Sequence, residues 1–328
     1  MAKLPLTFAC GLYDRVLPLY TGEVQAAGID LNFVVLNNPR EIFDRMGGGQ
    51  EFDAAEFSSS EFISRVAAGD RAFVALPFFP SRTFRHSMIT INKRSGIAKP
   101  KDLEGKRVGV PLYTQTAAIF IRGMLQHDHG VDMSKIHWIQ GALNHTGSHG
   151  NPSAPPLLKP VDIEIADPRR SLSDLIDKGE IDAITATNVP TSFKRNPDVV
   201  RLFPNYREVE RDYYKRTGIF PIMHLVVIKR EIVEKNPFVA TSLYEALVAS
   251  RQRALARMRE TGALRYMLPW MTADIDEIDE VFGGDPWPDG IEANRKTLQA
   301  LVTYLHEQHL IAKPIPIEDL FHKTFHTL

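Results

Sequence analysis

The chain has 328 residues, of which 44% are hydrophobic and 24% charged, a composition typical of a folded protein of about two domains. Its 39 Lys and Arg residues nearly balance 40 Asp and Glu residues, which argues against a nucleic-acid partner. Cys10 is the single cysteine, so an internal disulfide framework and a cysteine-based zinc or iron–sulfur site are excluded.

The N-terminal segment is too short and too quickly polar to resemble the apolar region of a signal peptide. The sequence also lacks the run of about 18 apolar residues that a membrane span needs. We therefore expect a cytoplasmic protein with no membrane partner.

Apolar periodicity and capping residues predict alternating strands and helices along most of the chain. Strands are expected over 28–35, 73–76, 88–91 and 106–110, and helices over 40–46, 60–68, 114–129, 237–259 and 291–309. The segment 142–160 is rich in Gly, Pro, Ser and Asn and is expected to be a loop. Strands separated by helices predict a largely parallel sheet with helices on both faces.

Two segments resemble each other, residues 41–54 and residues 171–183. Both are predicted to form a helix, a glycine stop and a strand that opens with a hydrophobic residue, Asp and Ala, at Asp53 and Asp182. One interpretation is a common αβ unit that recurs by chance. The other is two similarly built α/β lobes with a cleft between them.

The densest candidate site is the segment 78–87, where Arg82, Arg85 and His86 stand among aromatic residues. Guanidinium groups bind carboxylates bidentately and stack on aromatic rings, and histidine delivers protons near neutral pH. The alternative is a basic turn that forms surface salt bridges.

Three further places could contact a ligand. The turn at 110–116 starts a helix, where free N–H groups attract anions, and its candidates are Tyr113, Gln115 and Thr116. His224 enters an apolar strand and is either a core residue or a functional acid. Ser58 and Ser59 follow the Asp53 strand and either line the ligand site or cap the next helix.

The sequence offers no familiar cofactor or metal motif. His127 and His129 stand two apart on a predicted helix and point to different faces, which disfavours joint metal binding. We therefore expect that the protein uses no cofactor and has no metal site. The use of a divalent metal ion is kept as the alternative.

Five segments together resemble the 4,5-dihydroxyphthalate decarboxylase family, and the match covers nearly the whole chain: residues 8–15, 79–87, 109–113, 217–224 and 287–295. The resemblance implies an α/β, two-lobed, type 2 periplasmic-binding-protein-like fold with a ligand cleft between the lobes. It also implies a discontinuous lobe of residues 1–88 plus 215–328 and a second lobe of residues 89–214.

The family implies a carboxy-lyase of aromatic degradation, whose partner is a small aromatic carboxylate; a homo-oligomer stays open. Protonation of the ring carbon that bears the carboxylate eases loss of CO2, and no cofactor is needed because the ring is its own electron sink. We expect Arg82 and Arg85 to hold the carboxylate that stays, since gripping the leaving group would stabilise the ground state. Of the two candidate acids, His86 is preferred because an apolar strand follows His224.

Three positions depart from the family pattern: Leu112 replaces an expected glutamate, Asn188 an expected arginine and Asp289 an expected aromatic residue. The last two make the expected cleft less positive, so the substrate could differ from a phthalate. Two rival functions remain, a non-catalytic solute-binding protein for an aromatic acid and a thiamine-precursor pyrimidine synthase. The lone Cys10 disfavours the second rival.

Overall fold

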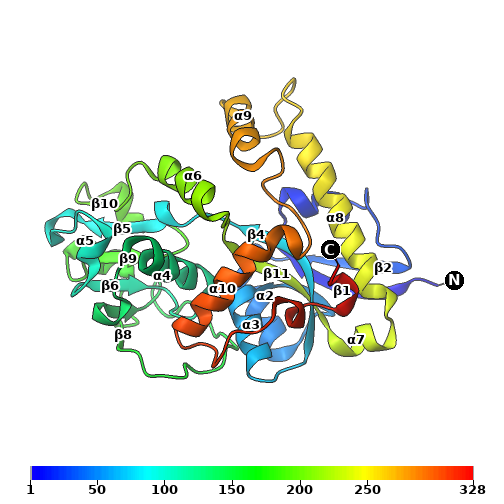
Figure 1. Cartoon of the computed structure of the whole chain (residues 1–328), viewed down its shortest axis with the longest axis horizontal. Coiled ribbons are helices and arrows are strands. Elements are labelled where there is room, and N and C mark those ends of the chain that lie inside the picture. Colours follow the sequence, from blue (N-terminus) through cyan, green and yellow to red (C-terminus); the bar gives the residue numbers. More distant parts are fainter. Residues whose placement is uncertain (1, 328) are drawn as a thin grey trace. The chain divides into compact units, whose positions relative to one another are not determined.

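The computed structural model describes residues 2–327, which form two β-sheets and the helices that cover them (Figure 1). The strands are β1 (Leu4–Cys10), β2 (Ile29–Val35), β3 (Ala54–Ser58), β4 (Phe73–Arg82), β5 (Ile89–Asn92), β6 (Arg107–Val110), β7 (His137–Gln140), β8 (Ile163–Ile165), β9 (Ala183–Thr185), β10 (Val199–Arg201) and β11 (Ile222–Lys229). The helices are α1 (Leu17–Tyr20), α2 (Pro39–Asp44), α3 (Ser59–Ala67), α4 (Thr116–His129), α5 (Leu172–Lys178), α6 (Tyr206–Thr217), α7 (Arg230–Lys235), α8 (Phe238–Met258), α9 (Met271–Phe282) and α10 (Arg295–Glu307).

Each sheet lies in its own compact unit. Unit 1 comprises residues 1–82, 222–299 and 315–328, and unit 2 comprises residues 83–221 and 300–314. These units differ from the predicted lobes in two ways. The segment 300–314 belongs to unit 2, and the chain passes from unit 1 to unit 2 after Arg82 and returns to unit 1 after Pro221. The lobe boundaries predicted from the sequence, and the cleft between the lobes, stay predictions.

The sheet of unit 1 has the order β2-β1-β3-β11-β4. β1 runs parallel to β2 and β3, whereas β11 runs antiparallel to both β3 and β4. Of the five strands described in this sheet, β2, β1, β3 and β4 therefore share one direction, and the expectation of a largely parallel sheet is confirmed with β11 as the exception. β11 is reversed because it begins where the chain returns from unit 2 and not after a crossover helix within unit 1.

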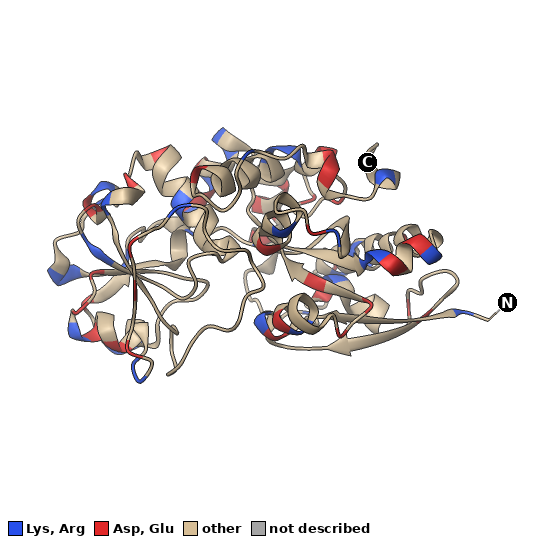
Figure 2. Ribbon diagram, turned by 90° about the horizontal axis from the view of Figure 1, so that it is seen from below, with Lys and Arg blue, Asp and Glu red and all other residues tan. Residues whose placement is uncertain are grey.

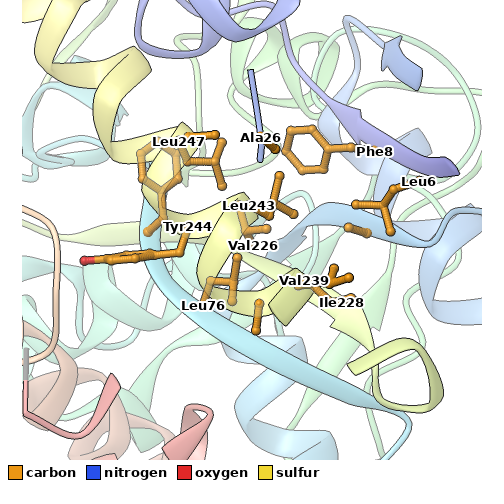
Figure 3. Packing of buried hydrophobic residues seen from close by; sticks show 14 of the residues in the cluster. Leu6, Phe8, Ala26, Leu76, Val226, Ile228, Val239, Leu243, Tyr244 and Leu247 are labelled. Carbon is orange, nitrogen blue, oxygen red and sulfur yellow. The ribbon is translucent and has the colours of Figure 1, made fainter. Parts of the chain in front are cut away.

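The core of unit 1 lies between this sheet and the long helix α8 (Figure 3). Leu76, Val226 and Ile228 from the sheet pack with Leu243 and Leu247 from α8, and all five side chains are fully or nearly fully buried. Apolar residues that alternate along β11 supply one face of the core, as the period-two pattern of a strand requires. This sheet carries Glu56 on β3 and His224 on β11.

Unit 2 contains the sheet β10-β5-β9-β6-β7-β8, in which β5 runs antiparallel to β9 and β10. The second half of α10 belongs to this unit and packs on α4. A Cβ atom on Gly123 of α4 would lie 2.3 Å from the Tyr304 ring, so only glycine allows this close approach. Gln308 fixes the segment by donating to the carbonyl oxygen of Ile119 at 3.0 Å.

Most of the predicted elements are confirmed within a few residues, including the loop over 142–160. The two similar segments are also confirmed as αβ units: α2 precedes β3 in unit 1, and α5 precedes β9 in unit 2. Two expectations were wrong in extent. β4 continues to Arg82 instead of ending at Leu76, and α4 begins at Thr116 with Gln115, not Thr114, at the N-cap position.

Lys and Arg residues and Asp and Glu residues are interspersed along the ribbons of both units (Figure 2). In the part of the chain that the structure describes, no helix is long and apolar enough to cross a membrane.

Candidate active site

A buried carboxylate organises a polar cluster at one end of the unit 1 sheet. Glu56 of β3 is completely buried, and its Oε1 accepts hydrogen bonds from Nδ1 of His224 at 2.5 Å and from the Tyr13 hydroxyl at 2.9 Å. Its Oε2 accepts from the Gly11 backbone N–H at 3.0 Å and faces the Sγ of Cys10 at 3.5 Å. Because a carboxylate only accepts, Nδ1 of His224 carries a proton, which leaves Nε2 as the second functional atom of the ring.

The pairing of β11 explains why His224 points toward Glu56. His224 lies opposite Ser58 of β3 and Ser81 of β4, so its side chain shares a sheet face with theirs. The register between β11 and β4 shifts on both sides of His224, and such irregularities re-aim side chains beside functional sites. The ring also packs edge-on against Phe43 at 4.8 Å and keeps 17% of its side chain exposed.

The cluster holds Glu56 in its charged form. Burial by itself would raise the pKa of the Glu56 carboxyl, but the charge and hydrogen bond of His224, with the Gly11 and Tyr13 donors, hold that pKa below its usual range. Burial and the neighbouring Glu56 charge raise the pKa values of the Cys10 thiol and the Tyr13 hydroxyl, so both stay protonated donors. The result is a buried anion in direct contact with one imidazole.

Sequence reasoning found His224 but missed Glu56, Tyr13 and Gly11. A glutamate in the middle of the short apolar strand 54–58 was the available signal, because a buried carboxylate needs partners. Tyr13 and Gly11 lie within the family motif at 8–15, although nothing in their spacing indicates that they contact β3.

The two arginines that were expected to form one clamp belong to different units. Arg82, in unit 1, donates from Nη2 to the Pro288 carbonyl oxygen at 2.8 Å and to Oδ1 of Asn294 at 2.5 Å. Arg85, in unit 2, donates to the Thr187 carbonyl oxygen at 3.1 Å, and burial lowers its pKa to about 10. Each guanidinium therefore has hydrogen-bond partners within its own unit.

His86 lies in an aromatic enclosure of unit 2. Its ring centroid is 5.4 Å from that of Phe203 and 5.2 Å from that of Tyr213, and its side chain is only 3% exposed. Nδ1 of His86 is 3.7 Å from Oε1 of Glu210, beyond hydrogen-bond range. This environment is that of a packed ring.

The candidates at the start of α4 lie together in unit 2. The backbone N–H of Tyr113 donates to Gln140 at 2.8 Å, and the Arg122 guanidinium stacks on the Tyr113 ring at 3.6 Å. Arg122 also donates to the Tyr113 carbonyl oxygen at 2.7 Å, so it braces the turn. The Gln115 side chain lies 3.2 Å from Nε2 of His149.

The remaining candidates and departures have simple surroundings. Ser58 and Ser59 are buried at the start of α3, Thr116 is buried in the first turn of α4, and Asn188 is exposed after β9. Leu112 is buried in unit 2. Asp289 pairs with Arg251 at 2.7 Å in unit 1, so its added negative charge is compensated there.

The structure also bears on metal binding. Within residues 2–327, no group of three or more His, Cys, Asp or Glu side chains is arranged to hold a metal ion.

The fold is that of periplasmic binding proteins. The periplasmic aliphatic sulphonate-binding protein SsuA from Escherichia coli matches with a TM-score of 0.55 and 12% identity over 99% of both chains. The alkanesulfonate-binding protein SsuA from Xanthomonas axonopodis pv. citri matches with a TM-score of 0.52 and 11% identity, over 98% of this chain and 99% of that one. The α/β, two-lobed, periplasmic-binding-protein-like fold class predicted from the sequence is confirmed.

Sequence similarity then identifies the family. The 4,5-dihydroxyphthalate decarboxylase of Comamonas testosteroni is 34% identical over 323 residues, which cover 98% of this chain and 97% of that protein. The enzyme of the same name from Pseudomonas putida is 38% identical over 218 residues, or 66% of this chain and 83% of that protein. Residues 22–149 also match the family described as NMT1/THI5 like. The chain belongs to the 4,5-dihydroxyphthalate decarboxylase family, and the resemblance seen in its motifs is confirmed.

Proposed function

We propose that this chain is a decarboxylase that releases CO2 from a hydroxylated aromatic carboxylate such as 4,5-dihydroxyphthalate, with His224 as the proton donor. The names of the two relatives support the reaction class and the substrate class. The observation that carries the choice of residue is the 2.5 Å hydrogen bond between His224 and the buried Glu56. The Asn188 and Asp289 departures leave the ring pattern of the substrate open.

The proposed reaction balances without a cofactor. The His224 imidazolium transfers a proton to the ring carbon that bears one carboxylate, and the hydroxyl para to this carbon stabilises the resulting cation. The bond from the ring to that carboxylate then breaks, its electron pair restores the aromatic ring, and CO2 leaves. From 4,5-dihydroxyphthalate the product is 3,4-dihydroxybenzoate, and solvent returns the proton to His224.

His224 suits this role better than His86, the residue preferred from the sequence. The apolar strand after His224 suggested that a charged ring would be disfavoured there, but the buried Glu56 carboxylate accepts a hydrogen bond from its Nδ1 at 2.5 Å. His224 also keeps 17% of its side chain exposed, against 3% for His86. An acid must approach the reacting carbon to about 3–3.5 Å, which an enclosed ring does not allow.

The direct test is to incubate the purified protein with 4,5-dihydroxyphthalate and to measure CO2 and 3,4-dihydroxybenzoate together. The proposal is supported if the wild type forms equal amounts of both products and the His224→Gln variant forms neither. A panel of hydroxylated benzoates and phthalates, screened first by thermal shift, identifies the preferred ring pattern. Stable binding of these acids without CO2 release would contradict the enzymatic function.

That outcome would favour the second candidate, a non-catalytic solute-binding protein, which the shared fold supports. The two candidates also differ in location, since a receptor for a transporter is exported. We propose a cytoplasmic location, and fractionation of cells that express the natural gene tests it.

A further inference from the structure

Arg15 lies beside the Glu56–His224 pair and was not among the candidates from the sequence. Its guanidinium carbon is 4.2 Å from the centroid of the Tyr13 ring and 4.6 Å from that of the Trp287 ring. Both rings belong to unit 1, as Arg15 does. Stacking on aromatic rings holds a guanidinium plane in place and shields it from water.

The hydrogen bonds of Arg15 leave one end of the guanidinium open. Nε donates to the Pro80 carbonyl oxygen, and Nη1 donates to Oδ1 of Asp14 at 3.0 Å. Within residues 2–327, Nη2 has no hydrogen-bond partner, and 17% of the side chain is exposed. Asp14 is itself engaged, because its Oδ2 accepts from the Tyr266 hydroxyl at 3.1 Å. Nη2 and the second proton of Nη1 remain for a ligand.

The Trp287 side of this arrangement is firmly held. The indole N–H of Trp287 donates to the Phe79 carbonyl oxygen at 2.7 Å. On either side of Trp287, Asp285 and Asp289 both pair with Arg251, at 3.0 and 2.7 Å. The loop therefore presents the indole to Arg15 in a fixed position, which lowers the entropy lost when a ligand binds.

Tyr13 connects Arg15 to the proposed proton donor. The Tyr13 ring contacts the Arg15 guanidinium, and the Tyr13 hydroxyl bonds the same oxygen of Glu56 that accepts from His224. Tyr13 therefore contacts the Arg15 guanidinium through its ring and is linked to the His224 imidazole through Oε1 of Glu56. In 4,5-dihydroxyphthalate, the carbon that keeps its carboxylate is next to the carbon that is protonated. The group that binds the retained carboxylate and the acid that donates the proton must therefore lie close together.

We infer that Arg15 is the specificity-determining residue that binds the carboxylate the substrate keeps. The inference rests on the proposed function, since it assigns a residue to that same site. Arginine binds carboxylates through two parallel hydrogen bonds, and the open end of Arg15 provides the donors. Arg15 binds the retained group because a tight grip on the leaving carboxylate would slow the reaction.

The test compares ligands that differ in one carboxylate. Calorimetry on the full chain measures the dissociation constants of 3,4-dihydroxybenzoate and of catechol, its analogue without the carboxylate, for wild type, Arg15→Gln and Arg15→Lys. We expect Arg15→Gln to weaken 3,4-dihydroxybenzoate about 10–100-fold and to leave catechol within about twofold. The affinity of Arg15→Lys for 3,4-dihydroxybenzoate should lie between those of the wild type and Arg15→Gln. Lysine keeps the positive charge but cannot form two parallel hydrogen bonds with a carboxylate.

Arg45 provides the matched control. It is another arginine of unit 1 that stacks on a ring, Phe52 at 4.7 Å, and pairs with two carboxylates, those of Glu41 and Glu51. Arg45→Gln should leave both dissociation constants unchanged. If Arg15→Gln does not fold, the ratio of the two dissociation constants in Arg15→Lys decides the question.

Two outcomes separate this inference from the proposed function. Unchanged affinity of Arg15→Gln and Arg15→Lys for 3,4-dihydroxybenzoate would overturn the role of Arg15, even if the wild type releases CO2. Selective loss of 3,4-dihydroxybenzoate affinity in Arg15→Gln, together with a wild type that releases no CO2, would support Arg15 and refute the decarboxylase. A wild type that releases no CO2 and binds neither compound would overturn both.

Discussion

The ring of Tyr13 folds back over Gly11, so that a Cβ atom on Gly11 would lie 2.6 Å from Cζ of Tyr13. Both residues donate to Glu56, one through its backbone N–H and the other through its hydroxyl. The absence of a side chain at position 11 therefore lets two donors reach one buried carboxylate.

Gly11→Ala should displace the Tyr13 ring and remove its hydrogen bond to Glu56. We expect a loss of about 1–3 kcal/mol in the free energy of unfolding, because a buried donor or acceptor is left unsatisfied. The rate of CO2 release should fall as well. Urea unfolding and steady-state kinetics check both. Gly48→Ala is the control, since a Cβ there meets no atom within 4 Å; equal behaviour of the two variants would contradict the role of Gly11.

The sequence predicted the elements better than it predicted the site. Period-two and helical patterns located β2 and α8 because burial repeats along a single element. His224 was recognisable as a polar residue in an apolar strand. Its partner Glu56 lies 168 positions away, and no local pattern encodes a contact between β3 and β11. The aromatic and basic segment 78–87 drew attention to Arg82 and Arg85, whereas tertiary contacts with loop carbonyl oxygens determine what these side chains do.

Glu56→Gln should lower kcat by about 10²-fold with little change in KM. The amide keeps the shape of the side chain but removes the negative charge that stabilises the His224 imidazolium in the proposed proton transfer. Steady-state kinetics at one pH measure both parameters.

A double mutant tests whether Glu56 acts through His224. Adding Glu56→Gln to His224→Gln should cost far less than it does in the wild type, because the two residues work as a unit. Strictly additive losses would show that Glu56 acts independently of His224.

Asp289 should make stability depend on pH. Burial is the main cause that raises its pKa to about 6, against the opposing charges of Arg251 and Arg82 and with help from Asp285. The folded chain therefore binds a proton more tightly than the unfolded chain. This contribution is fully present below about pH 4, the usual range of an aspartate, and is lost as the pH rises through about 6.

Asp289→Asn removes this titration. The free energy of unfolding of the wild type, relative to that of Asp289→Asn, should fall by on the order of 2–3 kcal/mol between pH 4 and pH 7. Urea unfolding at several pH values measures the difference. Parallel profiles of the two proteins would show that Asp289 does not titrate in this range.

Removal of metal ions should leave the activity intact. In the proposed reaction the hydroxyl para to the reacting carbon accepts the developing charge, and His224 supplies the proton. Dialysis against EDTA, followed by measurement of metal content and CO2 release, checks this. A loss of activity that one added divalent ion restores would require a metal in the mechanism and would revise the proposal.

The two histidines separate most clearly by kinetics. His224→Gln should lower kcat by about 10²–10⁴-fold, the usual contribution of a general acid, with little change in substrate affinity. His86→Gln should instead act mainly on stability, because the His86 ring fills a space between Phe203 and Tyr213 and its Nδ1 lies beyond hydrogen-bond range of Glu210. Steady-state kinetics, calorimetric affinity for 3,4-dihydroxybenzoate and thermal unfolding of both variants resolve the three quantities. A large loss of kcat in a folded His86→Gln, with an active His224→Gln, would return the donor role to His86. If both variants decarboxylate at the parent rate, neither histidine is the acid, and the proton comes from Tyr113 or from water.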